Sequence, residues 1–131
     1  MSDAAPPLPR LPQRPAQGHK GTFGTVVVFG GCHAGGRAMM GAAPLAALGA
    51  LRSGAGLAKL VMPADLLAAG LTICPSATGA GLPQVKGGGL DREAAPQVLD
   101  RMLAGATAAV IGPGLGEGDV ERALSLRAVQ Q

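Results

Sequence analysis

A β-branched apolar run enclosed by glycines, near the start of the chain, constrains the fold most strongly. Residues 25–31 have the sequence Thr-Val-Val-Val-Phe-Gly-Gly and follow a glycine-rich loop at residues 18–24. This composition is typical of a strand buried on both faces of a sheet. Residues 43–53 then have the pattern of a helix, and residues 58–62 that of a second strand. The order predicts a parallel βαβ unit, and hence an α/β fold with a mostly parallel sheet flanked by helices.

A second transition from strand to glycine turn lies far downstream. The apolar residues 108–111 lead into residues 112–116, which have the sequence Gly-Pro-Gly-Leu-Gly. In parallel sheets, anionic ligand groups bind at the carboxyl ends of the strands, against N–H groups of turns and helix N-termini. The two glycine turns therefore predict a nucleotide-like ligand at that edge.

The helix predicted at residues 43–53 has an orderly start and an apolar stripe. Pro44 falls in its first turn, where a missing N–H group removes no hydrogen bond. Leu45, Leu48 and Leu51 recur at intervals of three residues. This spacing predicts that the three leucines pack the helix onto the sheet.

Three aspartates are expected to cap the first turns of further helices. Asp65 follows the second predicted strand, Asp91 precedes a helix that ends at Leu103, and Asp119 precedes a last helix. Residues 72–89, rich in glycine and proline, are predicted to form a long loop. The middle helix offers three residues to the core: Val98, Leu99 and Met102.

The composition indicates one globular domain and excludes some classes of partner. The chain has 131 residues, of which 47% are hydrophobic and 15% charged, so disorder is not expected. Aromatic residues make up 2%, with no Trp or Tyr, and the net charge is +3. Nucleic-acid binding would need aromatic side chains to stack on bases. A phosphate-rich small ligand therefore accounts better for the positive net charge.

The cysteines and the hydropathy indicate a cytoplasmic protein. Cys32 and Cys74 are the only two cysteines, too few for the disulfide framework of a small secreted protein, and we expect reduced thiols. Cys32 and His33 are adjacent, but no second Cys/His pair completes a tetrahedral metal site. No apolar run reaches the length of a membrane span, and no signal-peptide core is present.

Residues 1–17 form a proline-rich lead-in before the domain. Five prolines favour extended polyproline II conformations. We expect this stretch to lie on the domain surface. A partner-binding motif of the PxxP type, formed by Pro6 and Pro9, is the alternative.

Taken with their spacing, several motifs carry a family resemblance over about residues 10–128. They are His-Lys-Gly-x-Phe-Gly at residues 19–24, Gly-Ala-x-x-Leu at 41–45, Ala-Leu-Arg-Ser-Gly-Ala-Gly-Leu at 50–57 and Ile-Gly-Pro-Gly-Leu-Gly at 111–116. Together they resemble the C-terminal domain of the YjeF family. These proteins are ADP- or ATP-dependent NAD(P)H-hydrate dehydratases with the ribokinase-like fold.

The resemblance implies an activity in metabolite repair. Hydrated NADH or NADPH would lie across the carboxyl edge of the sheet, and a phosphoryl group from ADP or ATP would activate the ring hydroxyl for elimination. Mg²⁺ is implied in the complete enzyme. The matching positions imply substrate contacts at Ala42, Gly112, Gly114 and Gly116. Relatives carry a Pro-Glu pair near Pro75, where this chain has Ser76.

The resemblance covers only the N-terminal half of the family domain. The Thr-Pro-His-x-Gly-Glu and Gly-Thr-Gly-Asp motifs of the second half do not occur. We therefore expect residues 18–131 to form a partial ribokinase-like fold without catalytic residues, inactive on its own.

Two other functions stay open. The first is a non-catalytic truncated paralogue that binds a longer subunit through an unpaired sheet edge, or forms a homo-oligomer. The second is an intact small dinucleotide-binding module, but residues 30–36 do not fit the spacing Gly-x-Gly-x-x-Gly, and no acidic residue follows about 20 residues later. Single-residue hypotheses are a phosphate contact for Lys20 and a general-acid role for His19.

Overall fold

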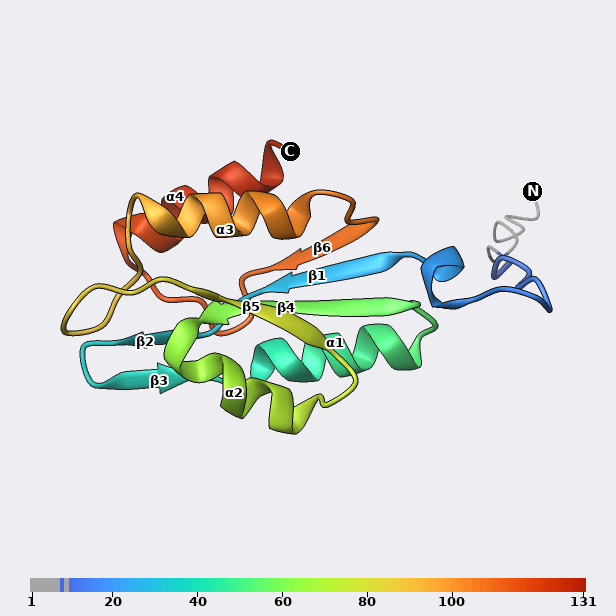
Figure 1. The fold of residues 1–131 in the computed structure, drawn as a ribbon, viewed down its shortest axis with the longest axis horizontal. Helices are drawn as coiled ribbons and strands as arrows, with labels where there is room; N and C mark the ends of the chain where they lie inside the picture. The colour runs from blue at the N-terminus through green and yellow to red at the C-terminus, as the bar shows by residue number, and fades with distance from the viewer. Residues whose placement is uncertain (1–7, 9) are drawn as a thin grey trace, which may run out of the picture.

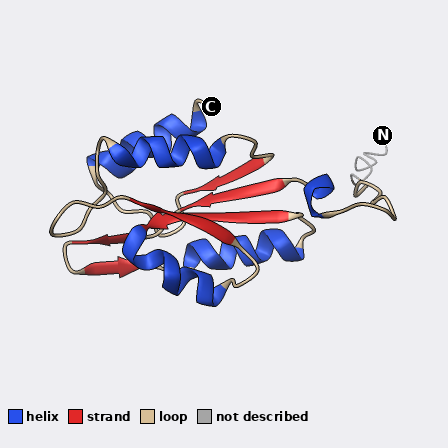
Figure 2. Cartoon of the chain, viewed as in Figure 1, coloured by secondary structure: helices blue, strands red, loops and turns tan. Residues whose placement is uncertain are grey.

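In the computed structural model, four parallel strands form a sheet between two layers of helices (Figures 1 and 2). The structure describes residue 8 and residues 10–131. The sheet has the order β5-β4-β1-β6, and a two-stranded antiparallel hairpin, β2-β3, stands at one end of it. The elements are η1 (Lys20–Phe23, a 3₁₀ helix), β1 (Thr25–Phe29), β2 (Cys32–Ala34), β3 (Arg37–Met39), α1 (Ala42–Arg52), β4 (Leu57–Pro63), α2 (Ala64–Ile73), β5 (Thr78–Leu82), α3 (Ala94–Leu103), β6 (Ala108–Ile111) and α4 (Asp119–Val129).

The central strand, β1, is buried as its sequence predicts. Val27, Val28 and Phe29 are fully buried, because β4 and β6 pair with the strand on either side and helices cover both faces. The strand ends at Phe29, two residues before the predicted end. Gly31 has φ +84°, and this left-handed conformation turns the chain out of the sheet. The predicted parallel pairing of β1 with β4 is confirmed.

Two hydrophobic clusters hold the helices to the two faces of the sheet. Helices α1 and α2 cover one face, and α3 and α4 cover the other (Figure 1). The cluster under α3 and α4 contains Val27, Phe29, Val61, Leu82, Leu99 and Leu124. The cluster under α1 and α2 contains Val28, Ala43, Ala47, Leu60, Met62 and Leu66. The core is therefore built from small and medium aliphatic side chains with one phenylalanine.

The predicted leucine stripe on α1 is wrong at Leu45. This side chain is 58% exposed, whereas Leu48 and Leu51 are half-buried against the core. Ala43 and Ala47 face the sheet instead and are fully buried. They are four residues apart and define one face of the helix, and Leu45 lies about 200° around the axis from Ala43. Small residues on this face let α1 approach the sheet closely.

The prediction of a long loop at residues 72–89 is also wrong, because β5 lies inside it. Two glycines of β5 touch their neighbours closely. A Cβ atom at Gly79 would lie 2.6 Å from the Leu60 carbonyl oxygen, and one at Gly81 would lie 2.8 Å from the Ala64 Cα. These glycines therefore serve the packing of an edge strand, although their composition indicates a loop.

The three aspartates begin helices in different ways. The last helix, α4, begins at Asp119 as predicted, but Asp119 is not its cap, because Gly118 occupies that position and no described side chain caps this helix end. The Asp91 Oδ1 atom accepts hydrogen bonds from the backbone N–H groups of Glu93 and Ala94, at 2.8 and 2.9 Å, and so caps α3 as predicted. Asp65 is not a cap, because α2 begins one residue earlier and the carboxylate contacts His33.

Helix α3 contributes the side chains that its pattern predicts. Leu99 is fully buried, and Val98 and Met102 pack partly buried against the same cluster. On the outer side of the helical layer, the Asp100 carboxylate accepts two hydrogen bonds from the Arg127 guanidinium of α4, at 2.7 and 2.5 Å. This hydrogen bonding holds the pKa of Asp100 below its usual range.

The described part of the lead-in lies against the amino edge of the sheet. The Arg14 guanidinium lies 3.8 Å from the centroid of the Phe23 ring and donates a hydrogen bond to the Gly54 carbonyl oxygen. Pro6 and Pro9, the proposed PxxP motif, lie outside the described residues. Among the residues that are described, no helix is long and apolar enough to cross a membrane.

Candidate functional site

The carboxyl ends of the four parallel strands meet at one edge of the sheet, beside the β2-β3 hairpin (Figure 1). Helix α1 begins at this edge, and the glycine loop at residues 112–116 follows the end of β6. In parallel α/β sheets, ligands bind at this edge. The fold therefore brings both predicted glycine turns and the start of α1 to the side where a ligand is expected.

The glycine loop after β6 is fastened to the turn after β1. The Gly112 N–H donates to the Phe29 carbonyl, and the Gly31 N–H donates to the Pro113 carbonyl, both at 3.0 Å. Gly112 has φ +112° and Gly114 has φ +68°. Both residues adopt left-handed conformations, in which any side chain larger than hydrogen is strained.

The three glycines of the loop face different surroundings. A Cβ atom at Gly112 would meet nothing within 4 Å, so this residue opens to solvent. One at Gly114 would lie 3.3 Å from Met39 Cβ, and one at Gly116 would lie 2.8 Å from Cys32 Sγ. Gly114 and Gly116 thus let the loop pack against the hairpin, and Gly112 is the glycine whose Cα faces open space.

Ala42 is the exposed first residue of α1. Gly41 precedes it, and no side chain of the described residues caps this helix end. Backbone N–H groups in the first turn of a helix lack partners within the helix and favour anionic groups. The small side chain of Ala42 and the uncapped first turn leave room for a ligand there.

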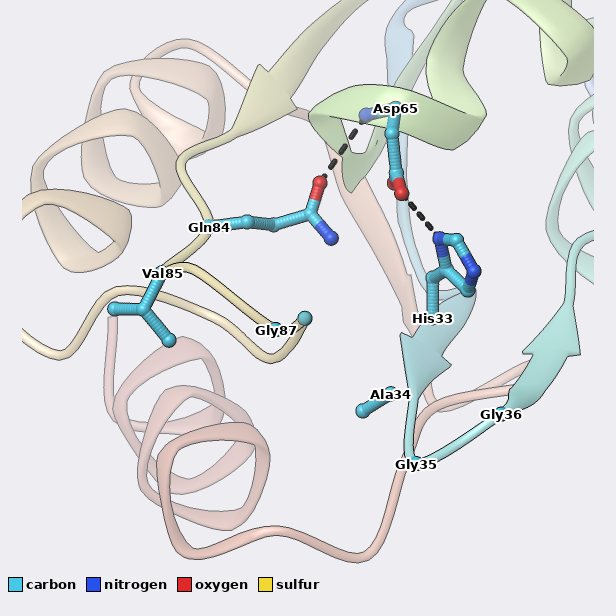
Figure 3. Close-up of a pocket in the computed structure, with 9 residues that line it drawn as sticks. His33, Ala34, Gly35, Gly36, Asp65, Gln84, Val85 and Gly87 are labelled. Atoms are coloured by element: carbon cyan, nitrogen blue, oxygen red, sulfur yellow. Dashed lines mark hydrogen bonds and ion pairs between the residues drawn. The ribbon is translucent and has the colours of Figure 1, made fainter.

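A cavity of about 270 Å³ lies at the same edge, on the side of β4 and β5 (Figure 3). The β2-β3 hairpin, the first turn of α2 and the loop after β5 line it. His33 Nδ1 contacts Asp65 Oδ2, and the Asp65 backbone N–H donates to Gln84 Oε1 at 3.2 Å. These three polar side chains come from three separate elements and meet in one place.

Sequence reasoning missed this group, because it treated His33 as part of a rejected metal pair and Asp65 as a helix cap. A usable signal was present. His33 follows the first strand of the βαβ unit within four residues, and Asp65 follows the second within two. In a parallel pair, both positions fall at the carboxyl edge.

A second cavity, of about 370 Å³, lies on the other side of the hairpin, and Ala34 and Gly35 line both cavities. Its lining includes Arg37 of β3, the exposed Glu117 and Glu121 of α4. Glu121 is 7% exposed. It lies in the first turn of α4, where a carboxylate is favourable toward the positive end of the helix dipole. The hairpin thus divides the carboxyl edge into two cavities.

The structure separates His19 and Lys20 from this edge. The His19 Nδ1 atom accepts a hydrogen bond from the Gly21 N–H and caps η1. Both residues precede β1 and so lie at the amino edge, away from the glycine loop. His19 and Lys20 therefore do not belong to the carboxyl-edge site. A phosphate contact for Lys20 and a general-acid role for His19 stay predictions.

Cys32 lies in β2, and Cys74 follows the last residue of α2. Cys32 and Cys74 are free and buried, as the prediction of reduced thiols requires. Within the described residues, no group of three or more His, Cys, Asp or Glu side chains could hold a metal ion. Residues 30–36 form a turn and most of the hairpin, so no helix opens directly after β1, as a dinucleotide fingerprint requires.

Solved structures with the same arrangement define the class of fold. A ribokinase-like superfamily protein from Enterococcus faecalis is 25% identical, with a TM-score of 0.68 over 90% of this chain and 36% of the other. A hypothetical protein from Streptococcus mutans is 29% identical, with a TM-score of 0.65 over 88% of this chain and 38% of the other. The chain has a ribokinase-like fold.

Comparison of the amino-acid sequence with known proteins identifies the family. The family model described as NAD(P)H-hydrate dehydratase matches residues 26–130, and the chain belongs to this family. A bifunctional NAD(P)H-hydrate repair enzyme of Moorella thermoacetica is 37% identical over 81% of this chain and 19% of its own length. An ADP-dependent (S)-NAD(P)H-hydrate dehydratase of Bacillus subtilis is 41% identical over 52% of this chain and 23% of its own length. The chain thus spans about a fifth of the length of these curated relatives.

Proposed function

We propose that this chain forms the substrate-contacting part of an NAD(P)H-hydrate dehydratase and binds hydrated NADH or NADPH at the carboxyl edge of the sheet. Ala42, Gly112, Gly114 and Gly116 would contact the substrate. The observation that carries the proposal is the juxtaposition of the uncapped start of α1 with the open Gly112 turn, in a chain of this family. Backbone N–H groups from both elements would bind the phosphates of the dinucleotide.

The roles of these residues differ in the proposal. Gly112 would approach the ligand directly, because open space lies beside its Cα atom. Gly114 and Gly116 would hold the loop against the hairpin so that their N–H groups keep a fixed direction. Ala42 would lie beside the ligand at the start of α1, where a larger side chain would intrude.

ADP or ATP is the proposed phosphoryl donor, as the Bacillus subtilis relative is described as ADP-dependent. The phosphoryl group would make the ring hydroxyl a better leaving group in the elimination. The described residues do not supply a three-ligand metal set, so no residue of this chain is assigned to Mg²⁺. We place the protein in the cytoplasm, where reduced nicotinamide nucleotides are used.

No residue of this chain is assigned a catalytic role, and we expect the 131-residue chain alone to give no turnover. The assay is recovery of the absorbance of reduced nicotinamide from hydrated NADPH, with ADP and with ATP. A heat-inactivated sample is the negative control, and the Bacillus subtilis relative is the positive control. Equilibrium dialysis of hydrated NADPH against the chain tests binding separately.

The turnover assay and the binding measurement test different parts of the proposal. Turnover above the heat-inactivated sample would refute the absence of catalytic residues. Failure of hydrated NADPH to bind at millimolar concentration would refute the proposed function itself.

A second candidate function, a non-catalytic subunit, is favoured by the free edge of the sheet. Among the residues that the structure describes, strand β6 pairs only with β1, and its residues Ala108, Ala109 and Val110 are exposed. An unpaired strand edge can accept a strand from another chain. Gel filtration of the chain alone, and mixed with a longer relative, tests this function. A single monomer peak in both samples would refute it.

A further inference from the structure

The cavity around His33 is lined by polar side chains from three elements, those of His33, Asp65 and Gln84. Its walls come from the hairpin, from the start of α2 and from the loop after β5 (Figure 3). The Gly89 N–H donates to the His33 carbonyl at 3.2 Å, and Ala34 forms a bridge with Gly88. The hairpin and the loop after β5 are therefore joined by backbone hydrogen bonds, and they fix the shape of the pocket.

Polar atoms without partners point to a ligand with hydroxyl groups. In the part of the chain that the structure describes, His33 Nδ1 pairs with Asp65 Oδ2 and Gln84 Oε1 accepts the Asp65 N–H. Asp65 Oδ1 and the Gln84 Nε2 amino group accept or donate no hydrogen bond within the same residues. The Asp65 side chain is 41% exposed, so both groups are accessible to a ligand from solvent. A carboxylate oxygen accepts a hydrogen bond, and an amide NH₂ donates one. A vicinal diol satisfies both groups, because one hydroxyl donates and the other accepts.

The size and walls of the pocket suit one sugar ring. At about 270 Å³ it is smaller than the pockets of about 300–1,000 Å³ that hold whole drug-sized ligands. Gly35, Gly36 and Gly87 have positive φ and leave open space where Cβ atoms would lie. Ala34 and Val85 add apolar contact for the carbon face of a ring.

The charge of the pocket disfavours a phosphate. Asp65 supplies the carboxylate in the lining, and neither lysine nor arginine is among the lining residues. A carboxylate at a strand end that hydrogen-bonds a ribose 2′-hydroxyl is the feature that favours NAD over NADP in other dinucleotide sites. Like charges would oppose a 2′-phosphate in the same position.

We propose that the pocket of His33, Asp65 and Gln84 binds the adenosine ribose of the hydrated dinucleotide, and that Asp65 selects the form without a 2′-phosphate. This proposal rests on the proposed function. Strand β5 lies two strands from β1, about 10 Å at the usual strand spacing. An extended dinucleotide whose phosphates lie against the start of α1 and the Gly112 turn can span that distance with its adenosine ribose. His33 is a positioning residue, because its contact orients the carboxylate.

The first test uses the two histidines of the chain as internal probe and control. His33 lies at the pocket, and His19 lies at the opposite edge of the sheet. Proton NMR of the imidazole resonances is recorded while the full chain is titrated with hydrated NADH. We expect the His33 resonances to shift and those of His19 to stay in place. Binding with no shift at His33 would overturn the proposal.

The second test compares the dissociation constants of hydrated NADH and hydrated NADPH. We expect the wild-type chain to prefer hydrated NADH by about fivefold, the effect of two like charges about 4 Å apart in water. Asp65→Asn keeps the side-chain volume and removes the charge, and it should bring the ratio to about one. Asp100→Asn makes the same charge change on α3 and should leave the ratio unaltered.

The outcomes separate this proposal from the proposed function. Equal affinity for both hydrates in the wild type, or a ratio that Asp65→Asn does not change, would overturn the ribose pocket alone. If neither hydrate binds, the proposed function fails and the ribose pocket fails with it. Melting temperatures of all variants show whether each one is folded, and Gln84→Glu is a second variant that replaces the donor amide with a carboxylate. It should weaken binding of both hydrates.

Discussion

Gly30 lies where β1, α1 and the glycine loop meet, and its replacement by alanine should destabilise the protein severely. Gly30 is buried directly after β1, between α1 and the glycine loop. A Cβ atom there would lie 2.3 Å from the Pro113 carbonyl oxygen and 3.1 Å from Ala43 Cβ. The carbonyl is backbone and cannot rotate away as a flexible side chain could. Relief would have to move the whole loop.

The expected magnitude follows from two losses. Overpacking of this kind costs about 1–3 kcal/mol. Moving the loop also weakens the hydrogen bond from the Gly31 N–H to the Pro113 carbonyl, which contributes about 0.5–1.5 kcal/mol. We expect Gly30→Ala to lower the free energy of unfolding by about 2–4 kcal/mol, a large part of the total of about 5–15 kcal/mol for a domain. The melting temperature should fall by about 8–15 °C for a chain of this size.

Gly49→Ala is the matched control. Gly49 lies inside α1, and a Cβ atom there would meet nothing within 4 Å. Alanine in a helix interior should raise stability by about 0.4–1 kcal/mol. Thermal unfolding followed by circular dichroism measures both variants. A melting temperature of Gly30→Ala within about 2 °C of the wild type would refute the packing of the loop on β1.

Three further predictions test other parts of the fold and the site. Ala42→Leu should weaken binding of hydrated NADPH, measured by equilibrium dialysis, while the melting temperature stays nearly unchanged; a large fall in melting temperature with unaltered binding would show that Ala42 is a packing residue. Leu60→Ala should lower the free energy of unfolding by about 2–5 kcal/mol in denaturant unfolding, because Leu60 is fully buried. Leu45→Ala, at a 58% exposed site, should change it by less than about 0.5 kcal/mol. Equal losses of stability would contradict the exposure of Leu45 on α1. Hydrogen bonding from Arg127 lowers the pKa of Asp100 in the folded state. The contribution of Asp100 to stability is therefore present above its unfolded pKa of about 3.9 and is lost as the pH falls through the folded pKa. Asp100→Asn should reduce the loss of stability on acidification below about pH 4; the same acid-induced loss in wild type and variant would refute the Asp100–Arg127 pair.

The elements that sequence predicts correctly are those with a strong local pattern. Strand β1 combines β-branched residues with glycines at its end, and its burial follows from that composition. The positive φ angles of Gly112 and Gly114 follow from a Gly-Pro-Gly turn after a strand. In both cases the signal lies within a few consecutive residues.

The elements that sequence reasoning missed depend on contacts between distant residues. Strand β5 has two glycines in five residues, and its extended form is imposed by pairing with β4. Leu45 belongs to an apolar stripe, but two alanines on another face of α1 allow a closer approach to the sheet. His33 and Asp65 are 32 residues apart and meet because β1 and β4 are parallel and end at the same edge.

The most direct test of the central claim is a map of backbone amide shifts when hydrated NADPH is added to the isotope-labelled chain. The claim is that the carboxyl edge, at Ala42 and the loop of Gly112 and Gly114, binds the substrate. We predict saturable shifts at these amides and none at Gly24 and Gly54, which lie at the amino edge. Shifts confined to the amino edge, or none at millimolar ligand, would contradict the account.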